Sequence, residues 1–275
     1  MKKVNVLRGL LLDLRATDPI DEFAYLLELV SGVISRRVLN LRTLPGDFLF
    51  KDIFVRSKVK EDCVFLVRKR SNDLFHVMPY YERQIWDFTK SIVKKGDVCI
   101  DVGAHIGTYT IPLARLVGQK GMIIAVEPLP MNISILKRNI KVNNLSNIVV
   151  IRKAAYYKRG RLRLSWNPLR TGMSTTVLNR GFSNFIEVEA DCLDEIVANV
   201  LNKPEIKLLK VDVEGAEIEV LQGAFYVLRH TSYVMVEVRS VTYGKVRELL
   251  NSLDFIELNS PPPSFYEHNL IGMKR

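Results

Sequence analysis

The feature of this sequence that most constrains its fold is the alternation of short apolar segments with amphipathic segments from Tyr80 onward. The expected strands are residues 98–102, 122–128, 147–155, 206–214 and 233–238. The expected helices are residues 82–95, 108–118, 131–144, 192–201 and 216–230, with apolar residues at helical spacing. Repeated strand–helix units of this kind predict a parallel sheet with helices on both faces.

The end of the chain predicts a further helix and two strands. Residues 241–253 have helical spacing, and strands are expected at 255–260 and 269–275. Two consecutive strands after a helix suggest an antiparallel strand at one edge of the sheet. An inserted β pair is expected at 161–166 and 185–190. The predicted fold class is therefore α/β, doubly wound and mostly parallel.

Residues 1–78 are expected to form an α+β accessory segment before a main domain at 79–275. A helix is predicted at 19–40 from its apolar spacing. Strands are predicted at 48–57, 63–70 and 74–78, with a turn at 71–73. A segment of this size is too short to be a confident independent domain.

Composition excludes several classes of protein. The 275 residues are 48% apolar and 25% charged, which is ordinary globular usage and excludes wholesale disorder. No apolar run approaches the roughly 18–20 residues that a membrane helix needs. The three cysteines are too few and too far apart for a disulfide framework or a zinc cluster. We therefore expect a cytoplasmic protein.

A glycine-containing loop is the first candidate binding site. Residues 101–108 (DVGAHIGT) follow an expected strand and begin an expected helix. Gly103 can take a positive φ and lets the backbone approach a ligand, and Gly107 lets the helix pack tightly on the strand. Free N–H groups at a helix start favour an electronegative ligand group. Two glycines four residues apart are weak evidence on their own.

Glu127 is the second candidate, at the end of the next expected strand. A carboxylate here can accept hydrogen bonds from both ribose hydroxyls of a nucleoside ligand, although a solvated loop carboxylate is the alternative. Nicotinamide enzymes share this feature, but their loop is usually G-x-G-x-x-G, which holds a pyrophosphate. The G-x-x-x-G spacing found here favours S-adenosylmethionine, which has no pyrophosphate.

The third candidate is the segment 207–217 (KLLKVDVEGAE), at the carboxyl end of the fourth expected strand, where ligands bind in open α/β sheets. With DVGAHIGTYT, AVEP, CLDEI and VMVEV, it resembles the FkbM family of S-adenosylmethionine-dependent methyltransferases over residues 80–275. The resemblance implies a seven-stranded, Rossmann-like class I methyltransferase fold. It also implies O-methylation of a sugar, glycolipid or secondary metabolite. His105 departs from the family, where asparagine is more common.

The resemblance further implies which residues contact the cofactor. Asp101 is expected near the methionine amino group, and Asp212 at the methionine end or the acceptor. Ala154 and Ala155, at the end of the third strand, are expected beside the adenine. The full expected set is Asp101, Gly103, Ala104, Gly107, Glu127, Pro128, Ala154, Ala155 and Asp212.

Methylation of a hydroxyl benefits from a general base near the acceptor oxygen. Asp212 is the leading candidate for this catalytic role, followed by Glu214 and His105. Lys210 is expected to orient a carboxylate or neutralise substrate charge. For Lys210 and Glu214 a purely structural ion pair is the open alternative. Glu237, at the tip of the fifth strand, is expected to bind substrate.

No metal site is predicted. Asp212 and Glu237 together are an alternative site for a divalent cation, but no third ligand is evident. His76, His230 and His268 lack ligand spacing and are expected to be ordinary surface or loop residues.

Charge is concentrated in residues 81–180, which hold 17 basic and 5 acidic residues within a chain of net charge +10. A basic and aromatic cluster lies there, made of Arg152, Lys153, Lys158, Arg159, Arg161, Arg163 and Arg170 with Tyr156, Tyr157 and Trp166. Such clusters can bind single-stranded nucleic acid, so an RNA methyltransferase is the second hypothesis.

An anionic glycan or glycolipid headgroup would use the same charges, and Arg161 and Arg163 are expected to bind substrate. The alternation in residues 161–166 is equally that of a strand with solvent-facing charges. A non-enzymatic binding protein and a nicotinamide oxidoreductase are further alternatives. The expected partner is a hydroxyl-bearing acceptor, and the oligomeric state is not predicted.

Overall fold

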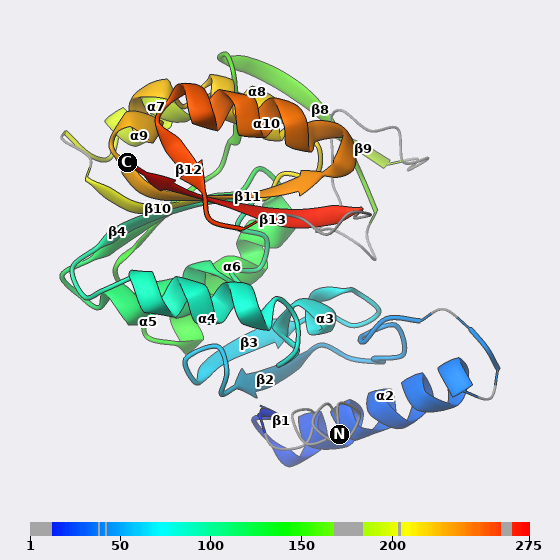
Figure 1. Cartoon of the computed structure of the whole chain (residues 1–275). Coiled ribbons are helices and arrows are strands. Elements are labelled where there is room, and N and C mark those ends of the chain that lie inside the picture. The colour runs from blue at the N-terminus through cyan, green and yellow to red at the C-terminus, as the bar shows by residue number, and fades with distance from the viewer. Residues whose placement is uncertain (1–12, 38, 42, 168–183, 203–204, 260–265) are drawn as a thin grey trace.

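A seven-stranded sheet forms the centre of the molecule (Figure 1). The computed structural model describes residues 13–37, 39–41, 43–167, 184–202, 205–259 and 266–275. The strands lie in the order β12 (Phe255–Glu257), β13 (Glu267–Lys274), β11 (Thr231–Arg239), β10 (Ile206–Val211), β4 (Val98–Val102), β5 (Met122–Val126) and β6 (Ile148–Ile151). β13 is antiparallel to both of its neighbours, and the other neighbouring pairs are parallel. The doubly wound α/β fold predicted from the sequence is thus confirmed.

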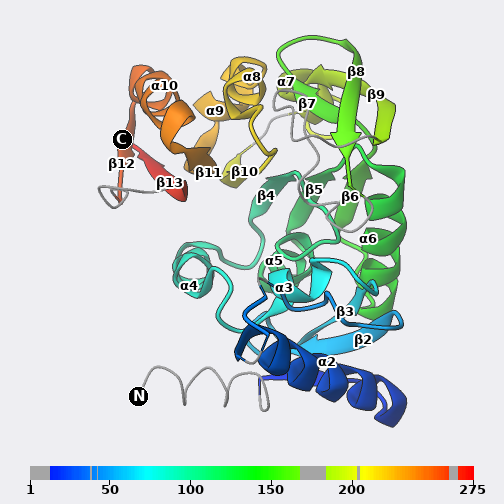
Figure 2. The ribbon, with the colours of Figure 1, turned by 90° about the vertical axis from the view of Figure 1, so that its right-hand side faces the viewer.

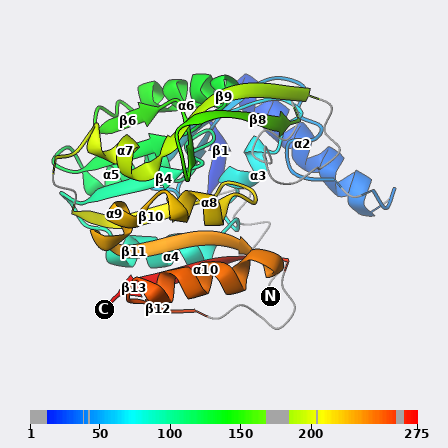
Figure 3. The same ribbon diagram turned by 90° about the horizontal axis from the view of Figure 1, so that it is seen from above.

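Helices cover both faces of this sheet, as Figures 1 and 3 show. One face carries α4 (Arg83–Ile92), α5 (Thr110–Val117) and α6 (Pro130–Val142). The other carries α7 (Leu193–Ala198), α8 (Glu217–Gln222), α9 (Phe225–Arg229) and α10 (Ser240–Ser252). Separate apolar clusters fill the two interfaces, because strands buried on both faces need apolar partners above and below.

Three expectations about this part of the chain need correction. The antiparallel strand lies second from the edge, because β13 is inserted between β11 and β12. The helix expected at 216–230 is two helices, interrupted at Gly223. A Cβ there would lie 2.0 Å from the backbone oxygen of Tyr156, so only glycine fits at the break between the two helices. The third strand ends at Ile151, and Ala154 and Ala155 belong to a separate strand, β7 (Ala154–Tyr156).

The inserted β pair is confirmed. β8 (Gly160–Trp166) and β9 (Asn184–Cys192) are antiparallel, and β7 pairs in parallel with β9 to complete a second, three-stranded sheet. Leu164 and Val188 are buried in its apolar cluster, whereas Arg161 and Arg163 are exposed. The alternation in this segment is therefore that of a strand with one covered face.

The N-terminal segment forms a third sheet with two helices (Figure 2). Its elements are β1 (Leu14–Ala16), α2 (Pro19–Arg37), β2 (Ile53–Ser57), β3 (Cys63–Val67) and α3 (Asp73–Val77). The strand expected at 74–78 is instead the short helix α3. Asp73 occupies its first turn, where a carboxylate is favourable, and the N–H of Asp73 donates to Oγ of Ser71. The interactions of Ser71 and Asp73 thus begin a helix at the residue where the sequence predicted the end of a turn.

This segment is joined to the main sheet through α6. β3 is an edge strand, and its backbone is bound by Asn139 of α6 and by Asn143, the residue that caps the C-terminal end of α6. Asn143 accepts from the N–H of Val64 at 2.9 Å and donates to its carbonyl at 2.6 Å. Asn139 accepts from the N–H of Leu66 at 2.7 Å and donates to the carbonyl of Ile106. The side-chain amides therefore supply hydrogen-bond partners for backbone groups of the edge strand β3, which would otherwise be buried without partners.

Replacing Asn143 with alanine is expected to lower the free energy of unfolding by about 2–4 kcal/mol, because both backbone groups of buried Val64 lose a partner. Urea denaturation measures this change. Lys137→Ala, an exposed change on the same helix, is the control and is expected to stay within about 0.5 kcal/mol. Equal effects of the two variants would contradict the proposed role of Asn143.

Candidate functional site

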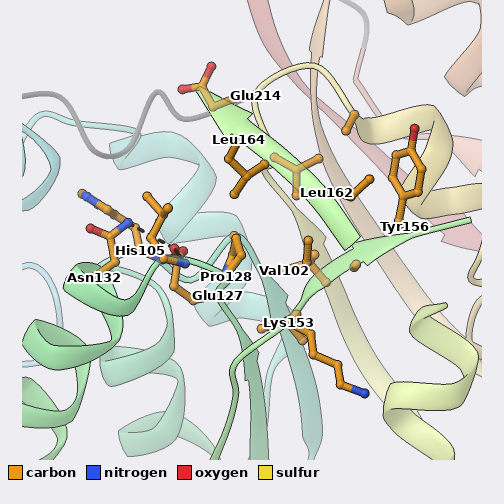
Figure 4. Close-up of a pocket in the computed structure, with 17 residues that line it drawn as sticks. Val102, His105, Glu127, Pro128, Asn132, Lys153, Tyr156, Leu162, Leu164 and Glu214 are labelled. Carbon is orange, nitrogen blue, oxygen red and sulfur yellow. Dashed lines mark hydrogen bonds between the residues drawn. The ribbon is translucent and has the colours of Figure 1, made fainter. Parts of the chain in front are cut away.

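Two neighbouring pockets lie at the carboxyl ends of the parallel strands. They share the residues Gly103, His105 and Glu214. The first pocket, drawn in Figure 4, is mostly apolar. It is lined by Val102, Gly103, His105, Val126, Glu127, Pro128, Leu129, Asn132, Lys153, Ala154, Ala155, Tyr156, Leu162, Leu164, Val213, Glu214 and Ala216. An apolar pocket with a few polar groups at one end suits a flat, partly polar ligand.

Glu127 is the buried polar group of this first pocket. Its Oε2 accepts from the N–H of His105, and its Oε1 accepts from the N–H of Leu129, both at 2.9 Å. The side-chain amide of Asn132 donates to Oε1 at 3.1 Å. Burial raises the pKa of this carboxyl, and the three donors act against that rise. These bonds hold the carboxylate at the pocket wall and leave acceptor capacity on Oε2.

The glycine loop turns in contact with strand β10. Gly103 has a φ of +84°, and a Cβ on it would lie 1.8 Å from the backbone oxygen of Asp212. The glycine is therefore required by the neighbouring strand end. Gly107 lines neither pocket. A Cβ there would lie 2.7 Å from Cδ1 of Leu136, so this glycine makes room for α6.

The second pocket is strongly polar and lies on the other side of Gly103. Six carboxyl groups line it: Glu82, Asp101, Asp212, Glu214, Glu237 and Glu267. Lys210 and the histidines His76, His105 and His268 line it as well. An acidic chamber next to the glycine loop favours cationic and hydroxyl-bearing groups over anions.

Asp101 presents an unused carboxylate oxygen in this chamber. Its Oδ2 accepts a 2.5 Å hydrogen bond from the hydroxyl of Thr110. Its Oδ1 is buried and has no hydrogen-bond partner in the described part of the chain. Burial raises the pKa of this carboxyl, while nearby Lys210 lowers it. A buried acceptor without a donor is costly, which makes Oδ1 a natural partner for an ammonium group of a ligand.

Asp212 and Glu237 form a hydrogen-bonded carboxyl pair beside Lys210. Nζ of Lys210 lies 2.8 Å from Oδ2 of Asp212. This ammonium and the bond from Glu237 hold the pKa of Asp212 below its usual value despite burial. The negative charge of Asp212, together with burial, raises the pKa of Glu237 well above its usual value. The pair therefore keeps a proton on Glu237 to higher pH than an isolated glutamate would.

Glu214 belongs to a different ion pair. Its carboxylate binds the guanidinium of Arg239, which also donates to Glu267 at 3.2 Å. Glu214 has a φ of +58°, as expected where the chain turns sharply after β10. Lys210 and Glu214 thus each take part in an ion pair, Lys210 with Asp212 and Glu214 with Arg239, rather than with each other.

The N-terminal segment supports the first pocket through Arg68. Its guanidinium makes a two-point pair with buried Asp73, at 2.6 Å and 2.8 Å. It also donates to Oδ1 of Asn132, the residue that holds Glu127. No motif in residues 1–78 identified Arg68 or Asp73, because their link to the pocket depends on tertiary packing.

His105 is a neutral side chain at this junction. Its Nε2 lies 3.2 Å from Nη2 of Arg68 and 3.5 Å from Asp73. Burial, with Arg68 nearby, lowers the pKa of His105 to about 3, although Asp73 acts against that shift. A group that binds protons so weakly is a poor general base at neutral pH.

Two other histidines were wrongly expected to be ordinary surface or loop residues. His76 and His268 both line the second pocket. His76 accepts or donates a 2.8 Å hydrogen bond with Asn72, and its ring packs 5.5 Å from that of His105. Spacing along the chain did not reveal them because they reach the pocket from α3 and β13.

The remaining expected site residues divide into two groups. Pro128, Ala154 and Ala155 line the first pocket, and Ala104 lines the second. Arg161 and Arg163 line neither of these pockets, because Leu162 and Leu164 occupy the inward positions of β8. Figure 4 shows both leucines at the pocket. Arg170 lies outside the described residues.

Neither a metal cluster nor a membrane-spanning helix is found in the described ranges. They contain no group of three or more His, Cys, Asp or Glu side chains arranged to hold a metal ion. They also contain no helix that is both long and apolar enough to cross a membrane.

The strand order and the position of the two pockets define a class I, Rossmann-like methyltransferase fold. A model of the methyltransferase FkbM domain matches residues 101–257, which is more than half of the chain. This chain therefore belongs to the FkbM methyltransferase family, as the motifs indicated, and S-adenosylmethionine is the cofactor of that family.

The matches to named relatives cover only part of the length of each relative. Methyltransferase sdnD of Sordaria araneosa is 31% identical over 153 residues, covering 45% of this chain and 59% of that protein. Hexuronic acid methyltransferase AglP of Haloferax volcanii is 28% identical over 147 residues, covering 54% and 58%. This chain thus spans less than two thirds of the length of these relatives.

Solved structures with a similar fold are more distant. The FkbM methyltransferase of Methylobacillus flagellatus is 16% identical with a TM-score of 0.46, covering 78% of this chain and 57% of that one. An rRNA methylase of Clostridium thermocellum is 15% identical with a TM-score of 0.49, covering 70% and 93%.

Arg68→Met is expected to lower the free energy of unfolding by about 3–5 kcal/mol, because it leaves the buried carboxylate of Asp73 without its counter-charge. Adding Asp73→Asn removes that charge, so the double variant is expected to be more stable than Arg68→Met alone. Urea denaturation of the wild-type protein, Arg68→Met, Asp73→Asn and the double variant gives the coupling energy between the two residues.

The control for this cycle is the exposed pair of Arg83 and Asp87, for which Arg83→Met is expected to cost less than about 1 kcal/mol. Strictly additive effects of the changes at Arg68 and Asp73 would contradict the pairing.

Proposed function

We propose that this chain transfers a methyl group from S-adenosylmethionine to a hydroxyl oxygen of a sugar, glycolipid or secondary metabolite. The observation that carries this proposal is the junction of the two pockets at Gly103, His105 and Glu214. A ligand lying across this junction would extend from the apolar pocket of Glu127 into the acidic chamber. Its central atoms would then lie beside the carboxyl pair of Asp212 and Glu237.

The residues of the two pockets fit this cofactor. In the proposed arrangement Glu127 accepts from a ribose hydroxyl, and Asp101 accepts from the methionine ammonium with its unpartnered Oδ1. The adenine would lie against the apolar wall of the first pocket, which includes Ala155, Leu162 and Leu164. The bound cofactor supplies a sulfonium methyl group, which is electrophilic without further activation.

In the proposed reaction the acceptor oxygen forms a bond to the methyl carbon as the carbon–sulfur bond breaks, which leaves a methyl ether and S-adenosylhomocysteine. Asp212 is ionised and accepts a hydrogen bond from the acceptor hydroxyl, which orients the oxygen. The hydroxyl proton passes to the pair of Asp212 and Glu237. Lys210 keeps Asp212 ionised and in place.

A neutral polyol is the acceptor that the chamber favours. Six carboxyl groups line it, and nearby cations partly balance Asp212, Glu214 and Glu267. Several carboxylates in one chamber repel a polyphosphate chain, which counts against the RNA hypothesis. The similarity to a hexuronic acid methyltransferase supports a sugar acceptor, although the carboxylate of a hexuronic acid would have to lie outside the acidic chamber. The exposed Arg161 and Arg163 remain candidates for contacts with an anionic part of the acceptor outside the chamber.

The acceptor class is tested with isotope-labelled S-adenosylmethionine and three sets of acceptors: neutral glycosides, hexuronic acid glycans and single-stranded RNA. Label is expected in a methyl ether of a glycoside, identified by mass spectrometry. Incorporation into RNA alone would contradict the proposed acceptor, and label on nitrogen would contradict the proposed acceptor atom.

Glu127→Gln and Asp101→Asn are each expected to weaken the binding of S-adenosylhomocysteine by about 1–3 kcal/mol, because each loses a charge-assisted hydrogen bond. Isothermal titration calorimetry measures the change. Glu248→Gln, an exposed change of the same charge on α10, is the control. Unchanged affinity in Glu127→Gln would refute its ribose role.

The carboxyl pair predicts a particular pH dependence of kcat. Glu237 has a raised pKa, so the pair loses its proton only as pH rises above the usual glutamate range, and it then becomes a better proton acceptor. In a plot of kcat against pH, turnover is therefore expected to increase over this pH range, which gives the plot an ascending limb. Asp212→Asn removes the charge that raises the pKa, so the limb should move to lower pH while turnover falls.

Glu237→Gln is expected to abolish the same limb, and Glu248→Gln to leave it in place. A limb that keeps its position in Asp212→Asn would show that the two carboxyls do not titrate as a pair.

A further inference from the structure

The acidic chamber has an aromatic wall, made of Phe75, His76 and Tyr81. Phe75 and His76 belong to α3, and Tyr81 lies between α3 and α4. All three residues line the chamber and are only half-buried. The ring centroid of Tyr81 lies 5.0 Å from that of Phe75 and 4.9 Å from that of His76, in edge-to-face arrangements. The three rings therefore form one aromatic surface in a pocket that is otherwise strongly polar.

Hydrogen bonds hold this aromatic wall in place. His76 shares a 2.8 Å hydrogen bond with the side chain of Asn72. Glu82, which follows Tyr81, has a φ of +47° and caps the start of α4. The carboxylate of Glu82 accepts from the side-chain amide of Asn269 in β13 at 2.6 Å. The wall is thus fixed by contacts within the chain, which lowers the cost of ordering it around a ligand.

The same contacts bring the aromatic wall to the carboxyl pair. Asn269 is the partner of Glu237 in the pairing of β13 with β11, and residues paired in this way carry their side chains on one face of the sheet. Burial and the carboxylates of Glu82, Asp212 and Glu237 raise the pKa of Tyr81, so its hydroxyl keeps its proton and remains a donor. A ring bound against the wall would therefore lie beside the pair that orients the acceptor oxygen in the proposed reaction.

The chamber also contains hydrogen-bond acceptors that lack donors. The Oδ1 atoms of Asn72 and Asn269 are buried and have no hydrogen-bond partner in the described part of the chain. Both residues line the chamber. Buried acceptors without partners favour a ligand that brings donors, such as hydroxyl groups. Aromatic rings favour an apolar surface, such as the C–H face of a saturated ring. A polyhydroxylated six-membered ring presents both.

The aromatic wall lies outside the part of the chain that the FkbM model matches. That part is residues 101–257, which include Asp212 and Glu237. Residues 72–82 precede it, and Asn269 follows it. The groups proposed for methyl transfer thus belong to the matched domain, whereas the wall comes from flanking segments. Proteins of one fold differ in the ligands they take, so such segments are where an acceptor-specific surface is expected.

We propose that the aromatic wall is the recognition surface for the acceptor and that it takes a pyranose ring. In this arrangement the C–H face of the ring packs on Phe75 and Tyr81, and the Tyr81 hydroxyl binds a ring hydroxyl. The free oxygens of Asn72 and Asn269 accept from further hydroxyls of the sugar. Tyr81 is then a specificity-determining residue. This inference rests on the proposed function, since it takes the chamber to be the acceptor site.

Binding of methyl pyranosides tests this proposal without methyl transfer. The full chain is titrated by NMR with the methyl pyranosides of glucose, galactose and mannose, with and without S-adenosylhomocysteine. Sorbitol, an open-chain polyol, and choline, a cation that aromatic rings also bind, are the comparison ligands. At least one pyranoside is expected to bind more tightly than both, with saturation transfer strongest to the C–H protons of one ring face. Tighter binding of sorbitol or choline than of every pyranoside would overturn the proposal.

Tyr81→Phe is expected to weaken pyranoside binding roughly fivefold, because one hydrogen bond is lost while the ring remains. Tyr80→Phe makes the same change in the adjacent tyrosine, which is 42% exposed and lines neither pocket, and it should leave the affinity unchanged. Equal affinities of the two variants would overturn the assignment of Tyr81.

Phe75→Leu tests the packing of the ring on the wall. It is expected to weaken pyranoside binding and to reduce saturation transfer to the C–H protons. Phe225→Leu, the same change at a half-exposed site on α9, is the control and should do neither. Urea denaturation shows whether both variants remain folded. Unchanged saturation transfer in folded Phe75→Leu would overturn the packing.

The design separates failure of this inference from failure of the proposed function. A chain that binds S-adenosylhomocysteine but none of the three pyranosides would overturn the aromatic wall as a sugar site and leave methyl transfer in place. A chain that binds pyranosides through Tyr81 but does not bind S-adenosylhomocysteine would support the wall and contradict the proposed function.

Discussion

The close approach of the Gly103 backbone to the end of strand β10 is the constraint on which the site depends. The N–H of Asp212 donates to the carbonyl of Val102, and no side chain fits on Gly103 beside it. The chain must therefore turn at this point in contact with β10. The turn separates the apolar pocket of Glu127 from the chamber of Asp212 and Glu237 and leaves them joined at one place. In the arrangement that we propose, cofactor and acceptor meet here at the carboxyl ends of the strands, where ligands usually bind in open α/β folds.

The N-terminal segment is part of this site rather than an attachment to it. Arg68 joins Asp73 to Asn132 and, through Asn132, to the carboxylate of Glu127. His76, from α3, lines the acidic chamber. Asn139 and Asn143 bind the edge strand of this segment, so its position is set by α6. The same helix follows β5 in the chain, and Glu127 is the first residue after β5. A shift of either part would disturb both pockets.

Periodicity predicted the central fold because buried parallel strands and amphipathic helices each impose a local pattern on the sequence. The glycine loop, Glu127 and Asp212 could be proposed from the sequence because sharp turns and strand ends restrict residue type, and the structure places Gly103, Glu127 and Asp212 at the two pockets. The pairing of Asp212 with Glu237, and the link from Arg68 to Asn132, depend on strands and helices far apart in the chain, so no local pattern carries them. The helix at Asp73 was missed because five residues are too few to show a helical repeat.

The central claim is that the two joined pockets hold S-adenosylmethionine and that the acceptor meets it in the acidic chamber. The most direct test is calorimetric titration of the wild-type chain with S-adenosylhomocysteine, with NADH as the comparison ligand. The account predicts saturable one-to-one binding of S-adenosylhomocysteine and no heat of binding from NADH. Binding of NADH without S-adenosylhomocysteine would contradict it, since the glycine loop would then hold a dinucleotide.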